Sequence, residues 1–119
     1  MPQSSELFFA SSNNHKFEEV KRILSNQGLT INFSKITLEE IQSNSLSEIA
    51  KRKAIDAFSR IQKPLIIEDD GLFIDSLNGF PGPYSSYVYD TIGNEGLMRL
   101  LEKIEFRSAK FVAVIAYCN

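Results

Sequence analysis

The amino-acid sequence predicts an α/β domain with a mixed, largely buried central sheet flanked by helices. Short apolar runs at Leu7–Ala10, Leu65–Ile67 and Ala109–Tyr117 alternate with segments whose apolar residues recur at helical spacing, and this alternation is typical of α/β folds. The chain has 119 residues, of which 43% are hydrophobic and 24% charged. That length and composition suffice for one core, so we expect a single domain over residues 1–119.

Charge and cysteine content argue against several classes of protein. The formal net charge is -2, whereas non-specific nucleic-acid binding needs a basic face. No apolar run is long enough to cross a membrane. Cys118 is the only cysteine and cannot form an internal disulfide, so a reducing, cytoplasmic location is expected.

The N-terminal part predicts a strand, a polar loop and a helix. Leu7–Ala10 is the expected strand, residues 11–15 the loop, and Lys16–Gln27 an amphipathic helix. A helix N-terminus exposes backbone N–H groups that suit a phosphate, and Ser11, Asn13 and Lys16 can add side-chain donors and a charge. The alternative is that the loop serves only to cap the helix.

Four further elements follow from patterning and capping signals. Leu29–Phe33 alternates as a half-exposed strand does. Ser45-x-x-Glu48 is a capping box that opens a helix ending near Ile61. A short amphipathic helix is marked by Leu97, Leu100, Leu101 and Ile104, with Thr91 or Asn94 as alternative capping residues. Ala109–Tyr117 predicts a central strand. The buried stripe of the second helix is expected to contain Ile49, Ala50, Ala54, Ala57, Phe58 and Ile61.

The stretch Leu65–Ser86 holds the densest group of candidate functional residues. Leu65–Ile67 predicts a buried strand, and three acids at residues 68–70 follow at its exit. Gly71 is expected to turn the chain sharply before a second extended segment, Leu72–Leu77. Adjacent carboxylates repel one another unless they share a cation, and oxygen ligands at a strand end suit Mg²⁺ with a substrate phosphate. The alternative is a solvated acidic turn.

This stretch also resembles the signature of the inosine triphosphate pyrophosphatase family. The resemblance rests on Glu68–Leu72, Asp75–Gly82 and Tyr84-Ser85, in that order. The family's opening motif, Thr/Ser-x-Asn-x-x-Lys, matches Ser11, Asn13 and Lys16, and further matches lie at Glu40-Ile41-Gln42 and Lys53-Ala54. One position departs, because the family usually has Ser or Thr where Asp70 stands. The resemblance implies hydrolysis of non-canonical purine nucleoside triphosphates (ITP, dITP, XTP) to the monophosphate and pyrophosphate.

The resemblance also implies roles for individual residues. Asp69 is the expected catalytic base or water-positioning residue, and Mg²⁺ is the expected cofactor. The expected metal ligands are Glu40 and Glu68, with Glu39 as the alternative to Glu40. A homodimer is the expected assembly. The residues expected to contact the substrate are Ser11, Asn13, Lys16, Lys53 and Ser85.

The resemblance covers essentially this whole chain but only the N-terminal two-thirds of a family member. The family's base-contacting segments, similar to Gly-Phe-Gly-Tyr-Asp-Pro and Ser-His-Arg, have no counterpart here, so we expect the domain to be incomplete at its C-terminus and the chain alone to be a poor enzyme. Two other classes stay open: a protein that binds nucleotide without hydrolysing it, and a structural or interaction domain. Magnesium-dependent pyrophosphate release separates the enzyme from both.

Overall fold

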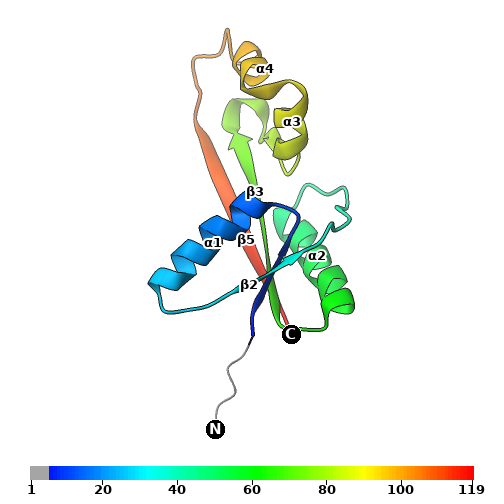
Figure 1. Ribbon diagram of the computed structural model, residues 1–119. Coiled ribbons are helices and arrows are strands. Elements are labelled where there is room, and N and C mark those ends of the chain that lie inside the picture. The colour runs from blue at the N-terminus through cyan, green and yellow to red at the C-terminus, as the bar shows by residue number, and fades with distance from the viewer. Residues whose placement is uncertain (1–5) are drawn as a thin grey trace.

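The computed structural model describes residues 6–119 and contains a mixed sheet with helices on both sides (Figure 1). This confirms the predicted α/β class. The elements in chain order are β1 (Phe8–Ser11), α1 (Asn14–Asn26), β2 (Asn32–Lys35), α2 (Leu46–Ile61), β3 (Leu65–Ile74), a 3₁₀ turn η1 (Asp75–Leu77), β4 (Pro81–Gly82), α3 (Ser85–Thr91), α4 (Gly93–Leu100) and β5 (Ala109–Cys118).

The sheet is organised around β3. Strand β1 lies between β2 and β3 and runs parallel to both, whereas β4 and β5 pair with β3 in antiparallel fashion. The chain leaves β1 through α1 toward β2 and returns through α2 to β3 on the other side of β1. Right-handed crossovers in opposite directions place the two helices on opposite faces of the sheet, as Figure 1 shows for α1 and α2. Ligands of such sheets bind beyond the strand ends at this reversal point.

Helix α2 supplies the main core of the domain. Ser45 caps the helix as predicted, because its side chain accepts a hydrogen bond from the backbone N–H of Glu48. The predicted stripe is also confirmed: Ala54 and Ala57 pack on Leu65 and Ile67 of β3, and all four are at most 3% exposed. Burying apolar area of this kind is the main stabilising term of a small domain. The acids of β3 therefore stand on a rigid base.

The predicted sharp turn at Gly71 is wrong. The strand runs unbroken from Leu65 to Ile74, and all ten residues pair with β5. Glycine is needed there for another reason, since a Cβ on Gly71 would lie 2.3 Å from the carbonyl oxygen of Gly82. The three acids consequently lie within a strand, where successive side chains point to opposite faces.

The segment between β3 and β5 forms a second, smaller lobe. Val88, Leu97 and Leu101 pack with Ile74 in a core separate from that of α2. The predicted turn at Asn78-Gly79 is confirmed, as both residues have positive φ. The short amphipathic helix is confirmed as α4 (Gly93–Leu100), but it ends before Leu101, and Ile92 rather than Thr91 or Asn94 is its N-cap residue. Helix α3 was not predicted at all.

Two strand predictions also need correction. Strand β2 begins at Asn32, three residues later than the predicted start at Leu29. Strand β5 was expected to be central, yet within residues 6–119 it pairs only with β3 and lies at the sheet edge. Its Phe111, Ile115 and Tyr117 side chains are more than half exposed. No helix among residues 6–119 combines the length and apolar character needed to cross a membrane.

Candidate active site

A cavity of about 320 Å³ lies in a gap along one edge of β3. Strand β1 pairs with β3 at Leu65 and Ile66, and β4 pairs with it again only at Leu72 and Phe73. The acids at residues 68–70 fall between these two pairings. Seven of the eight predicted site residues line this cavity: Ser11, Asn13, Lys16, Glu40, Lys53, Glu68 and Asp69.

The loop between β1 and α1 forms one end of the cavity. Asn13 caps α1, and its Oδ1 accepts a hydrogen bond of 3.1 Å from the backbone N–H of Lys16. Ser11 Oγ accepts one of 3.0 Å from the backbone N–H of Asn13. These contacts hold the loop in shape while the Asn13 amide nitrogen and the Ser11 hydroxyl hydrogen stay available to donate. The capping role and a ligand-binding role are therefore compatible.

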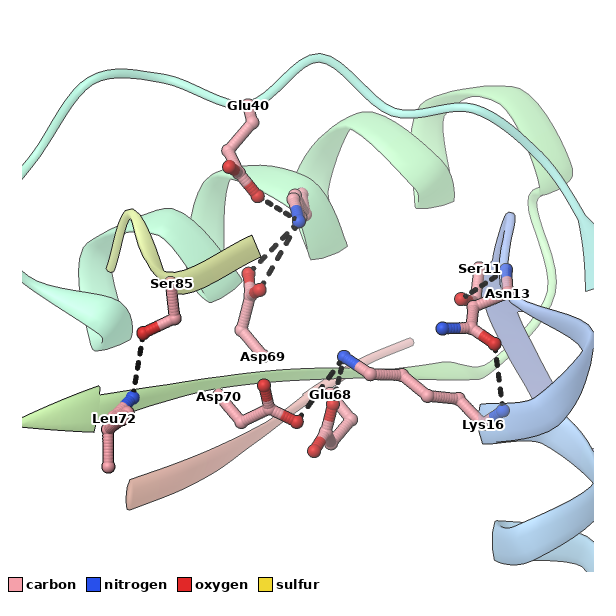
Figure 2. Close-up of polar contacts among 10 residues, drawn as sticks. Ser11, Asn13, Lys16, Glu40, Glu68, Asp69, Asp70, Leu72 and Ser85 are labelled. Atoms are coloured by element: carbon pink, nitrogen blue, oxygen red, sulfur yellow. Dashed lines mark hydrogen bonds and ion pairs between the residues drawn. The ribbon is translucent and has the colours of Figure 1, made fainter. Parts of the chain in front are cut away.

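Lys53 joins two acids on the α2 face of β3. Its position, four residues after Ile49 and four before Ala57, places it on the buried stripe of the helix. The ammonium lies 2.6 Å from Glu40 Oε1 and 3.1 Å from Asp69 Oδ2 (Figure 2). A lysine on a buried face needs such partners, because an unpaired buried charge is costly.

Lys16 makes the corresponding contacts on the α1 face. Its ammonium lies 2.6 Å from Glu68 Oε1 and 3.5 Å from Asp70 Oδ2 (Figure 2). Glu68 and Asp70 share this face because they are two residues apart in a strand, whereas Asp69 points the other way. This contact explains what Asp70 does at the position where the resemblance expected Ser or Thr: it gives Lys16 a second anionic partner.

Glu40 lines the cavity and Glu39 does not. Glu39 instead borders a separate groove with Arg52 and Asp56 on the outer side of α2. Of the two alternatives left open by the sequence, the structure brings Glu40 to the other acids.

The cavity is short of positive charge. Its lining includes the two lysines and four carboxylates, an excess of two negative charges. Burial raises the pKa of Asp69, and the charge and hydrogen bond of Lys53 oppose that rise only in part. Burial likewise raises the pKa of Glu68, against the opposing effect of Lys16 and with a further rise from the hydrogen bond and charge of Asp70.

The excess of negative charge also affects Lys16 and two carboxylate oxygens of the cavity. Burial lowers the pKa of Lys16, but the hydrogen bond and charge of Glu68, together with Asp70 and Asp69, outweigh burial and raise it. Glu68 Oε1 and Asp69 Oδ2 are buried, and each faces a lysine ammonium, at 2.6 and 3.1 Å respectively. Such oxygens could hold a hard cation.

Ser85 is the predicted site residue that does not line the cavity. Its hydroxyl accepts a 2.8 Å hydrogen bond from the backbone N–H of Leu72 and donates a 2.6 Å bond to the carbonyl oxygen of Gly82. Pro83 and Ser86 line the cavity from this side instead. No local pattern predicts a role for these two residues, because their position depends on contacts between α3 and β3, which are separated along the chain.

Fold and site together define an α/β protein with a lysine-and-carboxylate cavity at the reversal point of its sheet, a type of site suited to a phosphorylated ligand accompanied by a cation. The model of the Ham1 family matches residues 7–119, and the chain belongs to this family. It is 48% identical over 114 residues to the dITP/XTP pyrophosphatase of Methanopyrus kandleri, covering 96% of this chain and 61% of the relative.

Other relatives agree with this assignment. The dITP/XTP pyrophosphatase of Hyperthermus butylicus is 46% identical over 113 residues, which cover 95% of this chain and 60% of the relative. The HAM1 protein of Coxiella burnetii superposes with a TM-score of 0.78 at 29% identity, over 96% of this chain and 63% of that one. The Ham1 protein of Staphylococcus aureus gives 0.72 at 26% identity, over 94% and 63%. The chain thus spans less than two-thirds of the length of these relatives.

Proposed function

We propose that this chain carries the phosphate- and metal-binding part of a nucleoside triphosphate pyrophosphatase. The substrates are non-canonical purine nucleoside triphosphates (ITP, dITP and XTP), cleaved to the monophosphate and pyrophosphate. The observation that carries the proposal is the cavity beside β3, where Lys16, Lys53 and the acids meet at the end of β1. Relatives named dITP/XTP pyrophosphatase, 46% and 48% identical, support the choice of substrate class.

The phosphate contacts in this proposal come from both sides of the cavity. Ser11 and Asn13 donate hydrogen bonds from the loop before α1, while Lys16 and Lys53 add charge from the two helices. Each lysine is already bound to carboxylates, so a polyanion must compete with them. Binding therefore depends on a cation that satisfies the acids as the lysines turn to the phosphates.

Mg²⁺ is the cation we propose. From the resemblance Glu40 and Glu68 would hold it, and the excess of carboxylates over lysines in the lining supports a cation at this cavity. No three acids, histidines or cysteines among residues 6–119 form a preassembled metal cage, which agrees with the habit of Mg²⁺ to use one or two carboxylates plus substrate phosphates. When bound, the ion offsets the charge that develops on the leaving pyrophosphate.

Asp69 is the proposed base or water-positioning residue. Asp69 is 8% exposed and belongs to β3, whose residues all pair with β5. Its carboxylate can therefore be kept at a fixed position near a bound phosphate. Its raised pKa brings it closer to neutral pH, where a general base works best.

We also propose that the protein forms a homodimer and is located in the cytoplasm. Exposed apolar side chains on the second lobe, among them Tyr87, Tyr89 and Met98, support contact with another copy. The mass of the protein in solution, measured by light scattering, tests this part.

Pyrophosphate release from ITP, XTP and ATP in the presence of Mg²⁺ tests the activity. Because the chain alone is expected to be a poor enzyme, we expect slow release with little preference among the three nucleotides. EDTA and Asp69→Asn should abolish this release, and Asp90→Asn, which removes an exposed acid of α3, should keep it. Nucleotide-induced thermal stabilisation without release would instead support a binding protein. If the protein shows no nucleotide binding and no pyrophosphate release, the proposal is wrong.

A further inference from the structure

The second lobe has two adjacent serines near the cavity, of which Ser86 lines it and Ser85 does not. Ser86 is exposed, lines the cavity with Pro83, and lies on the side opposite to the loop of Ser11 and Asn13. Ser85 is only partly exposed, and its hydroxyl already uses one donor and one acceptor on backbone groups. Figure 2 shows Ser85 and Ser11 at opposite ends of the group of acids.

The hydrogen bonds of Ser85 tie the second lobe to the strand that carries the acids. Leu72, which donates to Ser85, is only two residues beyond Asp70 in β3. Gly82, which accepts from Ser85, pairs with Leu72 and has its carbonyl oxygen pressed against Gly71. One hydroxyl therefore joins the start of α3, the β4 turn and β3 at a single point.

We infer that Ser86 donates a hydrogen bond to the bound nucleotide, and that Ser85 is a positioning residue that holds Ser86 against the acid strand. The inference rests on the proposed function and deepens it. It gives Ser85 a different role from the direct substrate contact expected from the sequence. The reason is chemical, because a hydroxyl has one hydrogen to donate and that of Ser85 is directed at Gly82.

The recognised group is a hydrogen-bond acceptor, a phosphate or ribose oxygen of the nucleoside triphosphate. Ser86 lies across the cavity from Ser11 and Asn13, so the nucleotide contacts both lobes at once. Neither the Ser86 hydroxyl nor the surrounding wall carries a charge, so its contribution is that of one neutral hydrogen bond, about fivefold to tenfold in affinity.

The test is a double-mutant cycle on the affinity for ITP with Mg²⁺, measured by calorimetry. Ser86→Ala should weaken binding about fivefold to tenfold and leave the melting temperature unchanged. Ser85→Ala should weaken binding by a similar factor, and the double variant should bind no worse than either single variant, because Ser85 acts through Ser86. Ser85→Thr, which keeps the hydroxyl, should restore binding.

Two outcomes would overturn the inference while leaving the proposed function intact. Additive losses in the double variant would show that Ser85 contacts the nucleotide directly. Normal ITP affinity in Ser86→Ala would remove the contact altogether. Hydrogen exchange measured without ligand tests the positioning role of Ser85 separately from the nucleotide contact of Ser86. Exchange of the Leu72 amide should speed up in Ser85→Ala and not in Ser86→Ala. Equal exchange in both variants would contradict the positioning role even if nucleotide binding is normal.

Discussion

The two faces of β3 carry the same kinds of charge on very different supports. On the α2 face, Lys53 joins Asp69 and Glu40 above a core whose residues are almost completely buried. On the α1 face, Lys16 joins Glu68 and Asp70, but α1 contains no buried residue and is fixed mainly by the stacking of Phe17 on Phe33, 4.4 Å apart.

Solvent exposure separates the two lysines but not the acids. The side chain of Lys53 is 16% exposed and that of Lys16 is 28% exposed, whereas each face has one more buried acid, Asp69 or Glu68, and one more exposed acid, Glu40 or Asp70. A group that must be held precisely near a reacting atom benefits from the rigid face. A charge that must leave its partner and follow a ligand benefits from the looser one. Within the proposed function, the different support of the two lysines favours chemistry on the α2 face and ligand capture on the α1 face.

The largest expected effect separates Asp69 from Glu68. Asp69→Asn should lower pyrophosphate release at least about a hundredfold, the scale of losing a general base, with a much smaller change in ITP affinity. Glu68→Gln, on the other face, should mainly raise the Mg²⁺ concentration needed for half-maximal release, and Glu40→Gln should do so more strongly. Equal losses of turnover in Asp69→Asn and Glu68→Gln would remove the division between the faces.

Substitutions of the two lysines should differ in their effect on protein stability more than in their effect on triphosphate binding. Lys16→Ala should weaken triphosphate binding about tenfold or more, as expected for a charge-assisted contact, with little change in melting temperature. Lys53→Ala should also lower the melting temperature, because it leaves the buried Asp69 carboxylate without its counter-charge. Lys21→Ala and Lys51→Ala are the matched surface controls on the same two helices. Equal melting temperatures for Lys16→Ala and Lys53→Ala would contradict the packing difference.

Asp70→Ser tests the looser face with a smaller change. Removing this carboxylate takes away one of the two anionic partners of Lys16 and one source of the raised pKa of Glu68. Triphosphate affinity should rise a few-fold, because an exposed ion pair contributes at most about 1 kcal/mol. Calorimetry with ITP and Mg²⁺ measures this, and weaker binding would mean that Asp70 assists the ligand rather than competing with it.

The smallest effect is on stability as a function of pH. Burial raises the pKa values of Asp69 and Glu68 in the folded state above their ordinary values, so the folded chain retains protons that the unfolded chain has lost. Without Mg²⁺, stability should fall as pH rises from about 4 through the raised pKa values. Asp69→Asn should flatten this slope in pH-dependent denaturation, and an unchanged slope would assign the loss to other groups.

The functional residues could be found from the sequence more readily than their arrangement. Ser11, Asn13 and Lys16 are close together in the chain, and both they and Lys53 match short motifs of the family that the sequence resembles, which is why they could be predicted. The unbroken course of β3 could not be predicted, because the acids and Gly71 end the apolar run while pairing with β5, some forty residues later, keeps the strand extended. The demand for glycine at position 71 likewise arises from Gly82, in another segment.

Between Ile66 and Leu72, β3 is joined to β5 alone, and this pair of strands is the connection between the two lobes (Figure 1). A two-stranded ribbon is more strongly twisted than a wider sheet, and here α2 packs against it through Ala54 and Ala57 on Ile67. Within residues 6–119 the two lobes are therefore linked along the ribbon, with no strand pairing across the gap itself. A nucleotide that contacts both lobes would form a second connection between them. Substrate binding would then make the whole chain stiffer.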